Sequence, residues 1–180
     1  MPSNLFTQVR VDSRGFDYAA APQSNVPVIA GIVLGTLATA VVGSFGSLNA
    51  PDFYAALSKP AWAPPAWLFG PAWTLLYAMM ALAAILVVRG RDMHLNKPLL
   101  VLYGAQLVAN GLWSWLFFHW QIGGAAFADA GLMLLLVAAT TLAFWQVRRV
   151  SGMLMLPYVA WVAFATALSY SVWQRNPSLL

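Results

Sequence analysis

Two long stretches without a charged side chain constrain the fold of this chain more than any other feature. Residues 26–48 and 66–88 are each 23 residues long and contain no Asp, Lys or Arg. A helix of about 20 apolar residues spans the roughly 30 Å hydrocarbon core of a bilayer. Only 8% of the 180 residues are charged, whereas soluble domains have about 25%, so a soluble fold could not cover this apolar surface. The two stretches therefore predict a membrane protein.

Three further stretches have the same character. They are residues 98–118, 125–145 and 153–173. Each is continuous, whereas the strands of a membrane β-barrel alternate between apolar and polar residues over about 10 positions. We predict an all-α membrane protein, a five-transmembrane-helix bundle over residues 26–175. Residues 1–25 contain two prolines and four charges but no long apolar run, which predicts a flexible tail.

The basic residues predict an orientation rather than a nucleic-acid partner. Nine Lys and Arg give a net charge of +4, but they are scattered in short segments and form no patch that could follow a phosphate backbone. Seven of them lie in the tail and in the second and fourth loops, and two, Lys59 and Arg175, lie on the other side. Cytoplasmic loops of membrane proteins are enriched in Lys and Arg. We therefore expect the N-terminus in the cytoplasm and the C-terminus outside.

The first loop, residues 49–65, differs from the other connections in length and composition. Pro60, Pro64 and Pro65 predict an extended backbone, because proline removes a hydrogen-bond donor and disfavours helix in the residue before it. The loop also contains apolar and aromatic side chains, namely Phe53, Tyr54, Leu57 and Trp62. Long ordered loops are often functional, so this one is a candidate lid over the bundle. The alternative is an aromatic belt at the headgroups.

Aromatic and polar residues recur at helical spacing in three of the predicted spans. The sets are Trp73 and Tyr77, then Gln106, Asn110 and Trp113, and then Trp161 and Ala165. Polar groups at membrane depth face the bundle interior because lipid offers them no partner. If the three faces converge, they line an aromatic pocket that suits a flat, largely apolar ligand. Alternatively, the two amides only join helices by hydrogen bonds.

Several chemistries lack the residues that they need. The chain has no Cys and no Glu, and Asp129 is the single acid within the predicted spans. Ion-coupled transporters usually need carboxylates at membrane depth, so this composition argues against ion-coupled transport. Sequence motifs of Ser hydrolases, zinc proteases and P-loop enzymes are absent. We expect no metal site, and we expect a binding protein rather than an ordinary enzyme.

The motifs resemble those of one membrane-protein family. Residues 53–65 read F-Y-A-A-L-S-K-P-A-W-A-P-P and are followed by P-A-W at 71–73. They resemble the signature W-Y-x-x-L-x-K-P-x-W-x-P-P of the TspO/MBR family, the tryptophan-rich sensory proteins and the translocator or peripheral benzodiazepine receptor proteins. The resemblance continues at residues 106–113 and 157–166. Phe53 replaces the first Trp of the signature, and Ser169 stands where Asn is frequent.

The resemblance implies a five-helix bundle, commonly dimeric, that binds porphyrins such as protoporphyrin IX and haem. These are ligands and not required cofactors, and sterol-like molecules and benzodiazepine-site compounds are further implied ligands. The implied function is a tetrapyrrole-binding sensor or translocator whose pocket is closed by the first loop. The implied binding residues are Tyr54, Trp62, Trp73, Asn110, Trp113, Trp161, Phe164 and Ala165.

Two alternatives and two further expectations accompany this interpretation. The protein could instead degrade porphyrins in light, with Trp73 and Trp161 as the photochemical residues, or it could transport sterols or lipids. The resemblance favours a bacterial rather than a mitochondrial membrane. Because small residues let helices approach closely, the pattern Ala105-x-x-x-Ala109 could seat a partner helix or a second subunit. The expectation of a homodimer comes from the family resemblance and not from this pattern.

Overall fold

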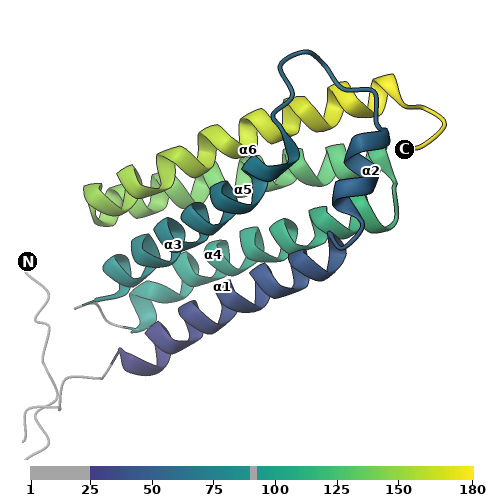
Figure 1. Ribbon diagram of the computed structural model, residues 1–180. Helices are drawn as coiled ribbons and strands as arrows, with labels where there is room; N and C mark the ends of the chain where they lie inside the picture. The colour runs from purple at the N-terminus through teal and green to yellow at the C-terminus, as the bar shows by residue number, and fades with distance from the viewer. Residues whose placement is uncertain (1–24, 90–92) are drawn as a thin grey trace, which may run out of the picture.

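The computed structural model describes residues 25–89 and 93–180, which form helices joined by short connections (Figure 1). In chain order the elements are α1 (Val26–Gly46), α2 (Ala50–Ala56), the 3₁₀ turn η1 (Ala66–Leu68), α3 (Phe69–Val88), α4 (Met93–Ser114), the π-helical turn η2 (Trp115–His119), α5 (Gly123–Val147) and α6 (Arg149–Arg175). Within these ranges no residue forms a strand, which confirms the predicted all-α class. The predicted tail lies outside the described residues, apart from Asn25.

Five helical segments are long and apolar enough to cross a membrane, as predicted. They are residues 26–46, 66–88, 96–119, 123–147 and 149–175. The helices reach further into the loops than the sequence indicated. Lys97, expected in the second loop, lies in α4, and the expected fourth loop of seven residues is reduced to Arg148 between α5 and α6.

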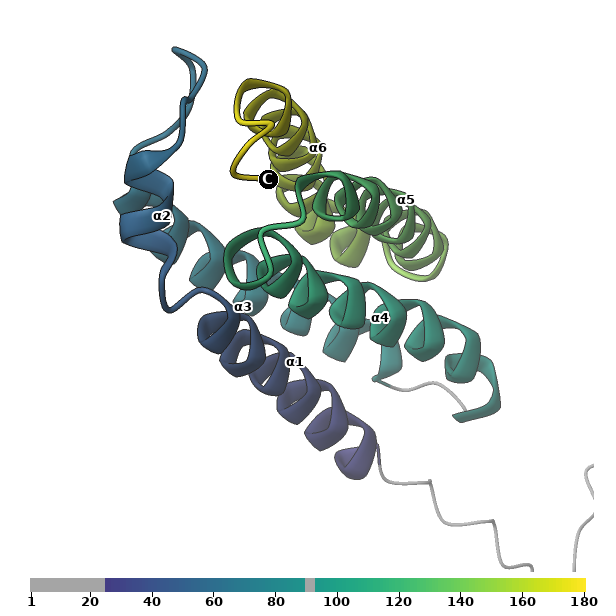
Figure 2. The same ribbon diagram turned by 90° about the vertical axis from the view of Figure 1, so that its right-hand side faces the viewer.

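The five spans form a ring whose order in space differs from their order in the chain. Neighbouring helices contact one another in the order α1, α3, α6, α5, α4 and back to α1 (Figure 2). The long helix α3 therefore lies between α1 and α6. This arrangement brings the aromatic face of α3 next to the faces of α4 and α6 that the sequence singled out.

One end of the bundle is closely packed. There α3 contributes Ala83, Ala84, Val87 and Val88, each at most 1% exposed. Buried side chains from the other helices complete the cluster, among them Val28, Ile32, Tyr103, Phe144 and Met155. The small alanines let the neighbouring helices approach α3 closely. We call this part of the bundle the packed end.

The first loop is partly helical, so the prediction of an extended backbone is wrong for its first half. Residues 50–56 form α2, with Pro51 in the first turn, where a missing N–H costs no helical hydrogen bond. Asp52 also lies in this turn, and an acid there is favoured by the helix dipole. The chain becomes extended at Leu57 and stays non-helical through Pro60, Pro64 and Pro65. We call residues 50–65 the roof; it lies at the same end of the bundle as the C-terminus (Figure 1).

Candidate functional site

A cavity of about 470 Å³ lies below the roof between α1, α2, α3 and α4. Its size falls within the range of about 300–1,000 Å³ that is common for small-molecule sites. One part of the lining is aromatic: Tyr54, Phe69, Trp73, Tyr77, Trp113 and Phe118. We call these six residues the aromatic wall. The lining from α1 and from the turn that follows it has only small side chains, Ala40, Gly43, Ser44 and Ser47, which we call the small wall.

Contacts between rings hold the aromatic wall in place. The Tyr54 ring meets the Phe69 ring edge to face, with centroids 5.5 Å apart. The Trp73 ring lies 5.7 Å from the ring of Tyr77. Trp113 stacks on Phe117 of η2 at 5.0 Å, with the two ring planes 15° apart. Such geometries are favourable for aromatic pairs and fix the orientation of each ring.

The small wall is a feature that the sequence interpretation missed. By charge and hydropathy, residues 26–48 form a uniform apolar span, yet Gly43, Ser44 and Ser47 follow Ala40 by three, four and seven residues, which is the spacing of one helix face. At Gly43 an added Cβ would lie 3.4 Å from Oγ of Ser114, so the backbone of α1 comes close to α4 there. That spacing of small residues was the signal that could have predicted a cavity beside α1.

Asn110 joins three helices and also lines the cavity. Its Oδ1 accepts a hydrogen bond of 2.5 Å from the hydroxyl of Tyr77 on α3. Its Nδ2 donates one of 2.9 Å to the hydroxyl of Tyr158 on α6. Gln106, one turn away, is fully buried, does not line the cavity, and donates only a weak bond of 3.7 Å to Sδ of Met80. Asn110 thus both lines the cavity and joins helices by hydrogen bonds, which are the two alternatives that the sequence left open. Gln106 is a packing residue.

The structure separates the eight predicted binding residues into two groups. Tyr54, Trp73, Asn110 and Trp113 line the cavity, and Trp62, Trp161, Phe164 and Ala165 do not. The ring of Trp161 lies 6.4 Å from that of Trp73 and 6.0 Å from that of Phe69. Because Trp73 and Phe69 line the cavity, Trp161 and its neighbours on α6 lie behind α3 as seen from the cavity.

The roof contacts this second group from above. Trp62 is 51% exposed, and its ring meets that of Phe164 with centroids 5.7 Å apart. The roof thus adds a buried aromatic side chain, Tyr54, to the cavity and an exposed one, Trp62, to the outer side of α6. Tyr54 thus faces the cavity and Trp62 does not, and the choice between lid and belt stays a prediction.

Internal hydrogen bonds fix the shape of the roof. The hydroxyl of Tyr54 donates to the carbonyl of Pro64 at 2.8 Å, which ties α2 to the proline segment. Nζ of Lys59 donates to the carbonyls of Tyr54 at 2.6 Å and Leu57 at 2.9 Å, and lies 4.8 Å from the centre of the Tyr54 ring. A basic side chain in this position satisfies carbonyls at the end of a short helix. Burial raises the pKa of the Tyr54 phenol above its ordinary value of 10.0.

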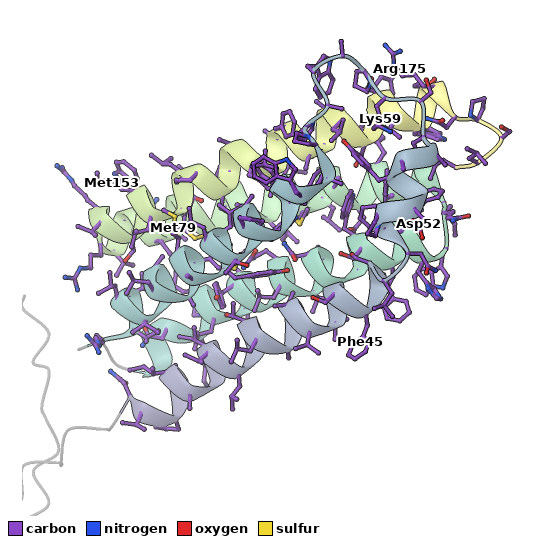
Figure 3. The ribbon with its side chains drawn as sticks, viewed as in Figure 1. Phe45, Asp52, Lys59, Met79, Met153 and Arg175 are labelled. Carbon is purple, nitrogen blue, oxygen red and sulfur yellow. The ribbon has the colours of Figure 1, made fainter. Side chains whose placement is uncertain are left out.

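The end of α6 fastens the roof to the bundle. Oδ1 of Asn176 accepts a hydrogen bond from the backbone N–H of Ser58 at 2.8 Å, and its Nδ2 donates to the carbonyl of Ser58 at 2.9 Å. Nδ2 also donates to the carbonyl of Val172 at 2.7 Å. We call this set of bonds the clasp. Lys59 and Arg175 mark the same end of the molecule in Figure 3.

Little in the site could perform metal chemistry. In residues 25–89 and 93–180 no group of three or more His, Cys, Asp or Glu could hold an ion. The cavity offers rings, hydroxyls and one amide, and the indole N–H of Trp113 has no hydrogen-bond partner among the described residues. Aromatic surface with a few polar groups is a lining that can bind and orient an organic molecule.

Comparison with known proteins agrees with the motifs. Residues 29–174 match the model of the TspO/MBR family. The chain belongs to this family. Together with the five spans, this establishes a multi-pass membrane protein and confirms the resemblance found in the first loop and in α3, α4 and α6.

Three relatives illustrate how far the similarity extends. Protein CrtK of Rhodobacter capsulatus is 38% identical over 148 residues, which cover 78% of this chain and 89% of the relative. The tryptophan-rich sensory protein of Cereibacter sphaeroides is 40% identical over 132 residues, covering 73% and 82%. The translocator protein of Homo sapiens is 40% identical over 126 residues, covering 69% and 75%.

Proposed function

We propose that this TspO/MBR protein binds a flat, largely apolar tetrapyrrole, such as protoporphyrin IX or haem, in the cavity below the roof. The observation that supports this most strongly is the pairing of the aromatic wall with the small wall. Rings such as Trp73 and Trp113 offer faces and edges for a planar ligand. The small wall lines the same cavity and carries no large side chain that would occupy the space beside these rings.

The proposed role is that of a sensor or translocator. Relatives are named translocator protein and tryptophan-rich sensory protein, and a cavity that binds an organic ligand would suit either role. If light-driven breakdown of a bound porphyrin accompanies this role, the reaction would begin at Trp73. Trp73 lines the cavity, whereas Trp161 lies behind it.

The proposed orientation places the roof end outside the cell. Among the described residues, Arg89, Lys97, Arg148 and Arg149 lie at the packed end of the spans, and Lys59 and Arg175 lie at the roof end. An excess of basic residues marks the cytoplasmic side. For a bacterial membrane, the cavity then lies in the half of the bilayer that faces away from the cytoplasm.

The proposed homodimer would use a different face of α4 from the one that the sequence suggested. Ala109 is only 5% exposed and is packed within its own bundle, so Ala105-x-x-x-Ala109 is not an outer stripe. Val101 and Val108 are 69% and 71% exposed, and an added Cβ at Gly104 would meet nothing within 4 Å. This outer stripe is the surface of α4 on which a second copy could pack closely.

The test is a titration of the purified protein in lipid nanodiscs with protoporphyrin IX in the dark. We expect saturable quenching of tryptophan fluorescence. Trp73→Phe should weaken binding by up to about tenfold, since aromatic contacts contribute about 0.5–1.5 kcal/mol. Trp161→Phe is the matched control and should change the Kd by less than about twofold, because its ring does not reach the cavity.

Two results would contradict the proposal. Quenching that does not saturate and is the same in both variants would mean that porphyrin only dissolves in the lipid. If illumination destroyed more moles of porphyrin than there are moles of protein, the protein would be an enzyme rather than a sensor or translocator.

A further inference from the structure

The cavity is open at its side. Five of its lining residues are exposed on the surface: Ser44, Pro51, Ala66, Gly70 and Thr74. Ser44 belongs to α1, and Gly70 and Thr74 belong to α3, while Pro51 belongs to α2 and Ala66 to η1. The lining residues contributed by α4 are not exposed. The opening therefore lies between α1 and α3, directly below the roof, and we call it the portal.

The portal lies in the part of the bundle that faces lipid. Ser44, Gly70 and Thr74 all fall within candidate membrane spans. Their hydroxyls are satisfied within their own helices, since Ser44 donates to the carbonyl of Ala40 at 2.8 Å and Thr74 to that of Gly70 at 2.9 Å. Serine and threonine that bond back to the preceding turn expose little polarity. The rim of the portal thus consists of small side chains that expose few polar atoms.

Among the described residues, the exposed lining residues that α1 and α3 contribute to the portal are small. An added Cβ at Gly70 would meet no atom within 4 Å. The facing helix contributes only the small wall, of which Ser44 is the outermost and most exposed member. A planar molecule dissolved in the bilayer could therefore enter edge first between the helices.

The way in from water is closed by hydrogen bonds. Raising the roof would break the two bonds between Asn176 and the backbone of Ser58. A route through the portal breaks neither of these bonds. We propose that the ligand enters and leaves sideways, between α1 and α3, while the clasp stays closed. This inference rests on the proposed function and narrows the ligand class to flat molecules that dissolve in a bilayer.

The test measures the rates of binding rather than the affinity alone. Protein in vesicles is mixed rapidly with vesicles that contain protoporphyrin IX, and tryptophan quenching is followed in time. A leucine side chain at Gly70 would narrow the portal from α3. We expect Gly70→Leu to slow association and dissociation by about tenfold each, because a narrowed portal impedes passage in both directions, whereas a lost contact with the bound ligand would speed dissociation.

Two variants complete the design. Gly131→Leu on α5 is the matched control, since an added Cβ there also meets nothing within 4 Å, and its rates should equal those of the unchanged protein. Asn176→Ala opens the clasp and should leave the rates within about twofold. A faster rate in Asn176→Ala with no effect of Gly70→Leu would overturn the portal and show entry from water.

Two further outcomes distinguish a failure of this inference from a failure of the proposed function on which it rests. A weaker Kd in Gly70→Leu without slower association would make Gly70 a contact of the bound ligand and would overturn the portal alone. Absence of saturable binding by the unchanged protein would overturn the proposed function and the portal together.

Discussion

The two ends of this bundle are built from the same helices but differ in how α1 and α3 meet. At the packed end, Val28 and Ile32 of α1 belong to one buried cluster with Val87 and Val88 of α3. At the roof end, the same two helices are separated by the cavity, with Gly43 on one side and Trp73 on the other. The comparison teaches that medium-sized side chains hold the helices together at one end. Small residues opposite large rings leave space at the other.

If this contrast is correct, the largest loss of stability will come from the packed end. Phe144 is 1% exposed and its ring stacks on that of Tyr103, with centroids 6.3 Å apart. We expect Phe144→Ala to lower the free energy of unfolding by about 3–5 kcal/mol, because it removes buried surface and leaves a cavity. Unfolding in mixed micelles measures this. A loss no larger than that of Trp73→Phe would contradict the division into two ends.

Between the two ends, we expect the loss of stability to depend on which of the two buried amides, Asn110 or Gln106, is replaced. Asn110→Leu leaves the hydroxyls of Tyr77 and Tyr158 without their shared partner and should cost about 1–3 kcal/mol of unfolding free energy. Gln106→Leu is the matched control. Oε1 of Gln106 has no partner among the described residues, so its replacement should be neutral or stabilising. Equal losses in the two variants would argue against the bridge at Asn110.

At the roof end, we expect a local rather than a global effect. Asn176→Ala removes three hydrogen bonds, each worth about 0.5–1.5 kcal/mol, so the amides of α2 should exchange hydrogen at least about tenfold faster. Asn25→Ala removes a single bond of 2.8 Å to the carbonyl of Val88 at the packed end and should not affect α2. Exchange in α2 that is unchanged in Asn176→Ala would show that the clasp does not hold the roof.

The smallest expected effect is a loosening of the roof at high pH. Because burial raises the pKa of Tyr54, the folded roof keeps the phenol protonated where an unfolded chain would ionise it. Its contribution to stability is complete below pH 10.0 and falls as the pH rises above that value. The protection of the α2 amides, which is the slowing of their exchange relative to the base-catalysed rate of an unfolded chain at the same pH, should therefore fall above pH 10.0, and Tyr54→Phe should remove this fall. The same fall in Tyr54→Phe would assign it to another group.

Much of the fold could be predicted from the sequence, because the spans are set by length and hydropathy. The number of spans and the all-α class follow from five apolar stretches in a chain with few charges. The helix ends and α2 did not follow. Proline indicates where a helix is interrupted, but Pro51 lies in the first turn of one and Pro98 lies inside α4. The position of a proline relative to the helix start decides its effect, and the sequence alone does not fix that start.

The candidate site was predicted in part, and the reason lies in the order of the helices. Periodicity placed Trp73, Asn110 and Trp161 on interior faces, but it could not show that α3 lies between α6 and the cavity. Trp161 therefore supports the wall from behind instead of lining the space. The small wall was missed because alanine, glycine and serine in an apolar span give no contrast in hydropathy.

The central claim is that the space between the small wall and the aromatic wall is the binding site. Gly43→Leu tests it most directly, since the added side chain would project into the cavity while its Cβ meets Ser114 at an ordinary 3.4 Å. The control is Gly31→Leu on the same helix, where an added Cβ meets nothing within 4 Å. In a titration with protoporphyrin IX we predict that saturable binding is lost in Gly43→Leu and kept in Gly31→Leu. Unchanged binding by a folded Gly43→Leu protein would contradict the account.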